Sequence, residues 1–233
     1  MLQLQSVCKR FGGFHAVNTI NLTVQPNELR CLIGPNGAGK STIFKLLTGV
    51  YPVTSGKVLF KGQDITQWPI WRRARHGLSI KMQIPGVYSD LTVRTNMRIA
   101  AQNYLELDQY EEINRLLSLV CLDGLANVLV KNLSHGQQQW LELGMALSTQ
   151  PSLLLLDEPT AGMGPDETRV TGEIVKALHE QGMTILVVEH DMEFVRQIAQ
   201  RVTVLHYGEI FAEGTLAEIE QREDVIRIYL GKG

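Results

Sequence analysis

Short, mostly apolar runs separated by glycine, proline or polar residues form the clearest pattern along the chain. The runs at 29–33, 153–156 and 184–188 show no regular alternation of apolar and polar residues, which is typical of buried parallel strands. At 20–24 the two kinds of residue alternate, which predicts a half-buried strand. A further strand is predicted at 57–60.

The stretch from about 91 to 149 has no strand pattern. Its apolar residues recur at helical spacing, as at Val93, Met97 and Ala100, so we expect a mostly helical insertion. After this stretch, predicted strands and helices alternate, which favours an α/β fold with a parallel sheet. The other predicted elements are an amphipathic helix through Val170, Ile174 and Leu178, a helix at 191–200, a strand at 202–206 and short helices at 215–230.

A glycine-rich segment between the strand at 29–33 and a helix ending at Gly49 is the strongest candidate for chemistry. It matches G-x-x-x-x-G-K-[ST], the phosphate-binding loop of nucleotide triphosphatases. The strand–loop–helix context favours this function over an ordinary glycine-rich turn, because backbone N–H groups and the helix start both attract phosphate. Lys40 is predicted to neutralise the β- and γ-phosphates, and Ser41 to ligate Mg²⁺. The predicted nucleotide-binding residues here are Gly34, Pro35, Asn36, Gly37, Ala38, Gly39, Lys40, Ser41 and Thr42.

Two carboxylates, Asp157 and Glu158, follow the apolar run at 153–156. Pro151 and Pro159 bound the run, so a buried strand is favoured over a core helix. Ligands of α/β proteins bind at the carboxyl ends of such strands. We expect Asp157 to hold Mg²⁺ and Glu158 to deprotonate the attacking water.

A second predicted anion site follows Leu133. Ser134 is expected to cap a helix from Gln137 to about Ser148, whose first N–H groups are then free. The segment Leu133–Gln137 resembles the Leu-Ser-Gly-Gly-Gln signature of the ATP-binding cassette family, with His135 in place of the first glycine. The resemblance implies that Ser134, Gly136 and Gln137 bind the phosphates of ATP held by a second cassette.

The resemblance extends over essentially the whole chain and assigns three more residues. It implies that Phe11 stacks on adenine, that Gln83 senses Mg²⁺ and the attacking water, and that His190 contacts the γ-phosphate. The family's aspartate after the catalytic glutamate is replaced by Gly164, so we expect different coupling between paired nucleotide sites. Asp166 is expected to cap the next helix.

The resemblance implies the fold of a two-lobed cassette ATPase over residues 1–233. Residues 1–83 and 150–233 would form a RecA-like P-loop core with an antiparallel β subdomain. Residues from about 84 to 149 would form an inserted helical subdomain that carries the signature.

Composition bears on the kinds of partner the chain can bind and on the compartment in which it works. The chain has 233 residues, 44% hydrophobic, and a net charge of −2, which does not favour nucleic-acid binding. The basic run 72–75 is expected to be a solvated helix face. No apolar stretch approaches the ~20 residues of a membrane span, and no signal peptide is expected. Three cysteines without metal-ligand spacing indicate a reducing, cytoplasmic compartment.

The main function predicted from the resemblance is the ATPase subunit of a membrane importer. The alternative is a soluble cassette ATPase of DNA repair or translation, but such proteins usually carry a long coiled coil or two fused cassettes. The segments 134–142, 188–192 and 214–231 are similar to cassettes that power uptake of branched-chain amino acids or urea. The implied partners are a second cassette, integral membrane permeases and, indirectly, a solute-binding protein. The chain would be peripheral, on the cytoplasmic face of the plasma (inner) membrane.

The segment from Ile84 to Leu91 is predicted to couple the cassette to the permease. Its apolar residues Ile84, Pro85, Val87 and Tyr88 are unusual for a loop. The alternative is that they fill the seam between the two lobes.

Overall fold

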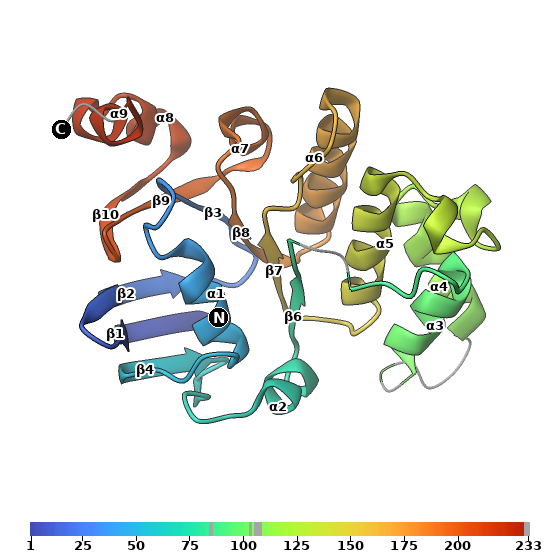
Figure 1. Cartoon of the computed structure of the whole chain (residues 1–233), viewed down its shortest axis with the longest axis horizontal. Helices are drawn as coiled ribbons and strands as arrows, with labels where there is room; N and C mark the ends of the chain where they lie inside the picture. The colour runs from blue at the N-terminus through green and yellow to red at the C-terminus, as the bar shows by residue number, and fades with distance from the viewer. Residues whose placement is uncertain (84–85, 103, 105–108, 231–233) are drawn as a thin grey trace.

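Two β-sheets form the centre of the chain in the computed structural model, which describes residues 1–83, 86–102, 104 and 109–230 (Figure 1). Ile84 and Pro85 of the predicted coupling segment lie outside the described residues. The smaller sheet is antiparallel, in the order β2-β1-β4-β5. Its strands are β1 (Leu2–Phe11), β2 (Phe14–Val24), β4 (Ser55–Phe60) and β5 (Gln63–Asp64).

The larger sheet has the order β10-β9-β3-β8-β7-β6. All its pairings are parallel except that of β9 with β10. Every residue of β3 and β8 is buried, as their sequences predict. The strands are β3 (Leu29–Ile33), β6 (Leu78–Lys81), β7 (Leu153–Asp157), β8 (Thr184–Val188), β9 (Arg201–His206) and β10 (Glu209–Gly214).

Helices cover both faces of the parallel sheet, and a separate helical group lies beyond β6 and α6 (Figure 1). This group contains α3 (Val93–Ala101), α4 (Gln109–Leu119), the short 3-10 helices η1 (Asp123–Leu125) and η2 (Val130–Asn132), and α5 (His135–Leu147). The others are α1 (Lys40–Thr48), α2 (Ile70–Arg75), α6 (Pro165–Glu180), α7 (Met192–Ile198), α8 (Leu216–Glu220) and α9 (Glu223–Leu230). The helical insertion, the antiparallel sheet and the α/β core are therefore confirmed.

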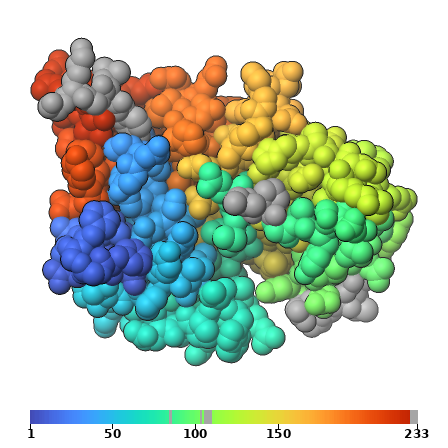
Figure 2. Space-filling view, viewed as in Figure 1, coloured from blue at the N-terminus to red at the C-terminus, as the bar shows by residue number. Residues whose placement is uncertain are grey.

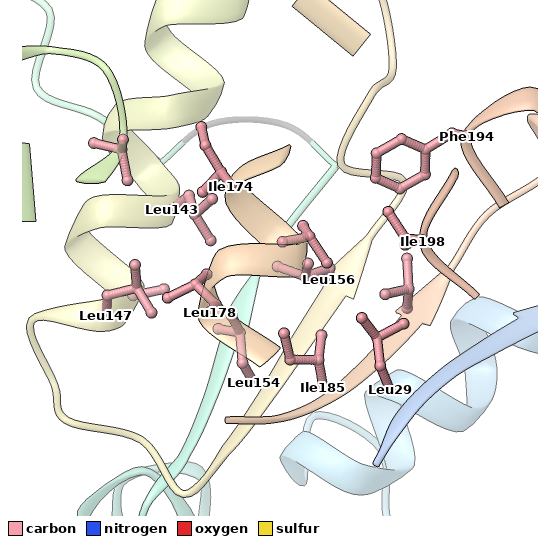
Figure 3. Close-up of a cluster of buried hydrophobic side chains, with 14 of the residues drawn as sticks. Leu29, Leu143, Leu147, Leu154, Leu156, Ile174, Leu178, Ile185, Phe194 and Ile198 are labelled. Atoms are coloured by element: carbon pink, nitrogen blue, oxygen red, sulfur yellow. The ribbon is translucent and has the colours of Figure 1, made fainter. Parts of the chain in front are cut away.

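The two faces of the parallel sheet belong to different hydrophobic clusters. Leu153 and Leu155 of β7 pack with α1 and the antiparallel sheet. Leu154 and Leu156, on the opposite face of the same strand, pack with α5, α6 and α7. Figure 3 shows this second cluster, with Leu29, Leu154, Leu156 and Ile185 from the sheet and Leu143, Leu147, Ile174, Leu178, Phe194 and Ile198 from the helices.

Two local expectations need correction. The signature helix begins at His135, two residues earlier than predicted, although Ser134 is its N-cap as expected. Arg73 of the basic run is only 2% exposed, so the run is not a fully solvated face. Its guanidinium donates to the carbonyls of Leu46 and Leu47, at the end of α1, and to those of Thr66 and Trp68.

Within the part of the chain that the structure describes, every helix is too short or too polar to span a bilayer. All three cysteines, Cys8, Cys31 and Cys121, are free.

Replacing Arg73 by alanine should destabilise the fold, because four carbonyl groups lose a buried donor. We expect the free energy of unfolding to fall by about 2–4 kcal/mol, measured by urea denaturation. The matched control is Arg75→Ala on the exposed face of α2, which should change it by less than about 0.5 kcal/mol. Equal effects of the two substitutions would contradict this role of Arg73.

Candidate active site

The loop between β3 and α1 depends on close backbone approaches that only glycine permits. A Cβ at Gly34 would lie 2.3 Å from the Leu205 carbonyl oxygen, and one at Gly39 would lie 2.5 Å from that of Ala16. Both glycines also have positive φ angles, 150° and 106°. The first three N–H groups of α1 lie before its hydrogen-bond ladder begins, so they are available to phosphate.

Lys40 is the first residue of α1, and its side chain reaches back to the start of this loop. Its ammonium group donates to the carbonyls of Gly34, at 2.6 Å, and Pro35, at 3.1 Å. Burial lowers the pKa of Lys40, while the carboxylates of Glu158 and Asp157 oppose that shift. A cation held here by backbone alone is suited to contacting phosphate oxygens.

Asp157 ends β7 and has the properties of a metal ligand. Its Oδ1 atom is buried without a hydrogen-bond partner, and burial and the charge of Glu158 raise its pKa. No group of three His, Cys, Asp or Glu side chains that could hold a metal occurs among the described residues. A bound Mg²⁺ would therefore need other oxygens, and the Ser41 hydroxyl and the phosphates of a nucleotide suit this ion.

Glu158 is the point at which three predicted catalytic side chains meet. Its Oε2 accepts a hydrogen bond from Gln83 Nε2 at 2.8 Å, and its Oε1 lies 3.5 Å from His190 Nδ1. The backbone of Glu158 has φ 45°, a conformation that is rare outside glycine and frequent at active sites. Gln83 and His190, far apart in sequence, are thus brought to the same carboxylate.

Glu189 supports this arrangement and was not among the predicted site residues. Its carboxylate, 1% exposed, accepts from the Thr160 hydroxyl and from the N–H groups of His190 and Asp191. It therefore joins the loop after β7 to the loop after β8. A carboxylate directly after a buried strand was the sequence signal that could have revealed it.

Two aromatic side chains border the pocket beside the phosphate loop. The pocket has a volume of about 330 Å³ and is lined by Phe11, Phe14, Ala16, Asn36, Gly37, Ala38, Gly39, Lys40, Ser41, Thr42 and Glu158. Phe11 packs edge-on against Tyr51, while Phe14 is 64% exposed. Phe14 is thus a second candidate for stacking on adenine, beside the predicted Phe11.

The predicted signature residues do not line this pocket. Ser134 and Gln137 form a capping box at the start of α5, and Gly136 is buried beside them. Figure 1 shows α1 and α5 on opposite sides of β6 and β7. The two predicted anion sites of this chain therefore lie apart from each other.

The sequence profile of the family described as "ABC transporter" matches residues 17–161, more than half of the chain. The chain belongs to the ABC transporter family. It is 37% identical to the high-affinity branched-chain amino acid transport ATP-binding protein LivG of Escherichia coli K12, over 100% of this chain and 98% of LivG. It is 34% identical to the corresponding protein BraF of Pseudomonas aeruginosa, with the same coverage.

Solved cassettes have the same fold. A nucleotide-free ATP-binding cassette from an ABC transporter has a TM-score of 0.90 and 28% identity, covering 100% of this chain and 99% of that one. The ADP conformation of the cassette MJ1267 has a TM-score of 0.89 and 28% identity, with the same coverage. A dimeric cassette, MJ0796, bound to ADP and Pi has a TM-score of 0.83 and 25% identity, covering 93% of this chain and 99% of that one. This chain is an ABC ATPase.

The region between the cassette's sheet and α5 contains buried charges that sequence reasoning missed. Glu142 of α5 accepts from the Gly86 N–H at 3.2 Å, and Gln139 donates to the Gln83 carbonyl at the same distance. Burial lowers the pKa of Lys81 to about 8, and the Glu142 and Asp157 carboxylates oppose the shift. Helix α5 is thereby bound directly to the segment around Gln83.

The loop after Glu158 differs from expectation at one position. Gly164 is the N-cap of α6, and Asp166 lies inside its first turn, so the prediction that Asp166 caps the helix is wrong. The Gly164 N–H donates to Glu167, three residues later, at 3.2 Å. Glu167 supplies the capping carboxylate because glutamate at this position reaches back to the N-cap.

Replacing Lys40 by alanine should weaken ATP binding by at least about tenfold, because the cation would contact ground-state phosphates. Titration with a fluorescent ATP analogue measures the dissociation constant. Lys57→Ala, which removes the same charge from an exposed position on β4, is the matched control. An unchanged dissociation constant in Lys40→Ala would contradict the assignment.

Proposed function

We propose that this cassette is the Mg²⁺-dependent ATPase subunit of an importer for branched-chain amino acids or a similar small polar solute. The meeting of Gln83 and His190 at Glu158, beside the phosphate-loop pocket, carries the proposal for hydrolysis. The full-length similarity to LivG and BraF supports the importer class and argues against the soluble alternative. Urea is a second candidate solute, because the segments 134–142, 188–192 and 214–231 also resemble cassettes of urea uptake systems.

Each residue of the site would have a distinct part in binding or hydrolysing ATP. Lys40 and the N–H groups of α1 would bind the β- and γ-phosphates, and Phe11 or Phe14 would hold adenine. Ser41, Asp157 and Gln83 would hold Mg²⁺, which neutralises phosphate charge. Glu158 would take the proton of the attacking water, Gln83 would orient that water, and His190 would donate to the γ-phosphate.

The complete site would need a second cassette. Ser134, Gly136 and Gln137 lie at the start of α5 and do not line the pocket beside the phosphate loop, so they would face the ATP of the partner. The dimeric form of the MJ0796 cassette supports such pairing. ATP bound between the two chains would stabilise the dimer.

The cassette would attach to the membrane through permease chains, on the cytoplasmic face. We propose that residues 1–83 and 150–233 act as the nucleotide-binding core and 84–149 as the helical signature part. The segment from Gly86 to Leu91 lies near their junction, and in Figure 2 the chain around β6 reaches the surface there. Tyr88 is 54% exposed, whereas Val87 packs against the core, so Tyr88 is the better candidate for contacting a permease.

Replacing Glu158 by glutamine should lower kcat by about 10²–10⁴-fold, because the general base is lost while size is kept. ATP binding should persist, since Lys40 and the loop are unchanged. Steady-state phosphate release and analogue titration measure the two quantities. The control is Glu180→Gln, at an exposed position near the end of α6. Normal turnover in Glu158→Gln would make His190 the next candidate for the base.

Replacing Tyr88 by alanine should abolish permease association and solute uptake but leave basal ATPase activity in place. The measurements are co-purification with the integral membrane subunits and uptake of labelled branched-chain amino acid in cells lacking the native cassette. Tyr207→Ala, at an 82% exposed tyrosine in the turn after β9, is the control. Uptake at the native level in Tyr88→Ala would exclude this docking role. If the unmodified cassette supports uptake of urea but not of branched-chain amino acids, the solute belongs to the other class.

A further inference from the structure

His135, which stands where the family signature has glycine, contacts the loop that follows Glu158. Its Nε2 atom lies 3.0 Å from the Ala161 carbonyl oxygen. A carbonyl can only accept, so Nε2 carries the hydrogen and donates it. The same nitrogen then cannot accept from Gln139, whose amide donates instead to the Gln83 carbonyl.

The loop is shaped to receive this side chain. Gly162 has φ 76°, and a Cβ there would lie 3.0 Å from His135 Nε2. The Ala161 N–H donates to the Glu158 carbonyl at 3.2 Å, and Glu189 holds Thr160 between them. Ala161 is therefore joined by hydrogen bonds, over three residues, to the backbone of Glu158, which has a positive φ angle of 45°.

Glu167 makes a second connection between the signature and this loop. One carboxylate oxygen accepts from the Ser134 hydroxyl at 3.1 Å, and the other accepts from the Gly164 N–H at 3.2 Å. A Cβ at Gly136 would lie 2.4 Å from the same carboxylate, so the group sits directly at the start of α5. A negative charge of this chain thus lies where a phosphate of the partner's ATP would bind.

We propose that His135 and Glu167 are positioning residues that make Glu158 of one cassette respond to ATP bound at its own signature helix. This inference rests on the proposed function, because it needs the site shared by two cassettes. The γ-phosphate displaces the Glu167 carboxylate from Ser134, which frees the Gly164 N–H. His135 keeps the loop attached to α5, so movement of α5 toward the phosphate repositions Ala161 and Glu158. The two residues thereby supply the coupling for which the family uses an aspartate at the position of Gly164.

The first test compares His135→Gly, which restores the family signature, with His135→Gln in the full-length chain. We expect kcat of the glycine variant to fall roughly 3- to 10-fold, the effect of losing one hydrogen bond. Its Hill coefficient for ATP should fall toward 1, with the affinity for the ATP analogue unchanged. Glutamine can place Nε2 near the Ala161 carbonyl, so it should retain both parameters. Native kinetics in the glycine variant, or equal impairment in both variants, would overturn the role of His135.

The second test measures the ATP-dependent dimer by analytical ultracentrifugation in a Glu158→Gln background. Adding Glu167→Gln removes the competing charge, so the dimer dissociation constant should fall roughly 3- to 10-fold. Glu180→Gln on the same helix is the control and should leave it unchanged. A dimer of unaltered affinity would overturn the role of Glu167 alone. Absence of any ATP-dependent dimer in the Glu158→Gln background would instead refute the shared site of the proposed function.

Discussion

The hydrogen bond from Gln83 to Glu158 is the contact on which the rest of the site depends. Gln83 follows the edge strand β6, and Glu158 follows its neighbour β7, so parallel pairing of the two strands brings both side chains to one end of the sheet. Gln139 of α5 then binds the Gln83 carbonyl. A single line of polar contacts thus runs from the proposed base to the helix that carries the signature. The Gln83 and Gln139 amide N–H groups each donate to a partner from a different part of the chain, which offsets part of the cost of burying polar groups here.

Patterns local in sequence predicted much of this structure. The buried strands β3, β7 and β8 follow from apolar runs, and the Ser134 cap follows from residue type. Strand β1 was missed, because register shifts after Leu4 and a positive φ at Ser6 interrupt its alternation. The phosphate loop was predictable because its function fixes the spacing of its residues.

Side chains that act between distant segments were not predictable in the same way. The run 72–75 indicates a basic helix but not which of its side chains points into the protein. The burial of Arg73 against the end of α1 is therefore visible only in the folded structure. Likewise, Glu142 and Glu167 have ordinary surroundings in sequence, and their importance comes from partners 56 and 33 residues away. Such contacts depend on tertiary structure, which local propensity does not encode.

The hydrophobic cluster in Figure 3 limits how the helical part can move. Leu143 and Leu147 of α5 belong to the same cluster as Leu154 and Leu156 of β7. Lifting the helix away from the sheet would expose this cluster to water, whereas a small displacement along the sheet would keep most of it buried. A shear motion of α5 would therefore expose less apolar surface than an opening hinge. Such a motion would keep the core dry, and its extent would be limited by the reach of Gln139 and Glu142, the side chains that bind α5 to the segment around Gln83.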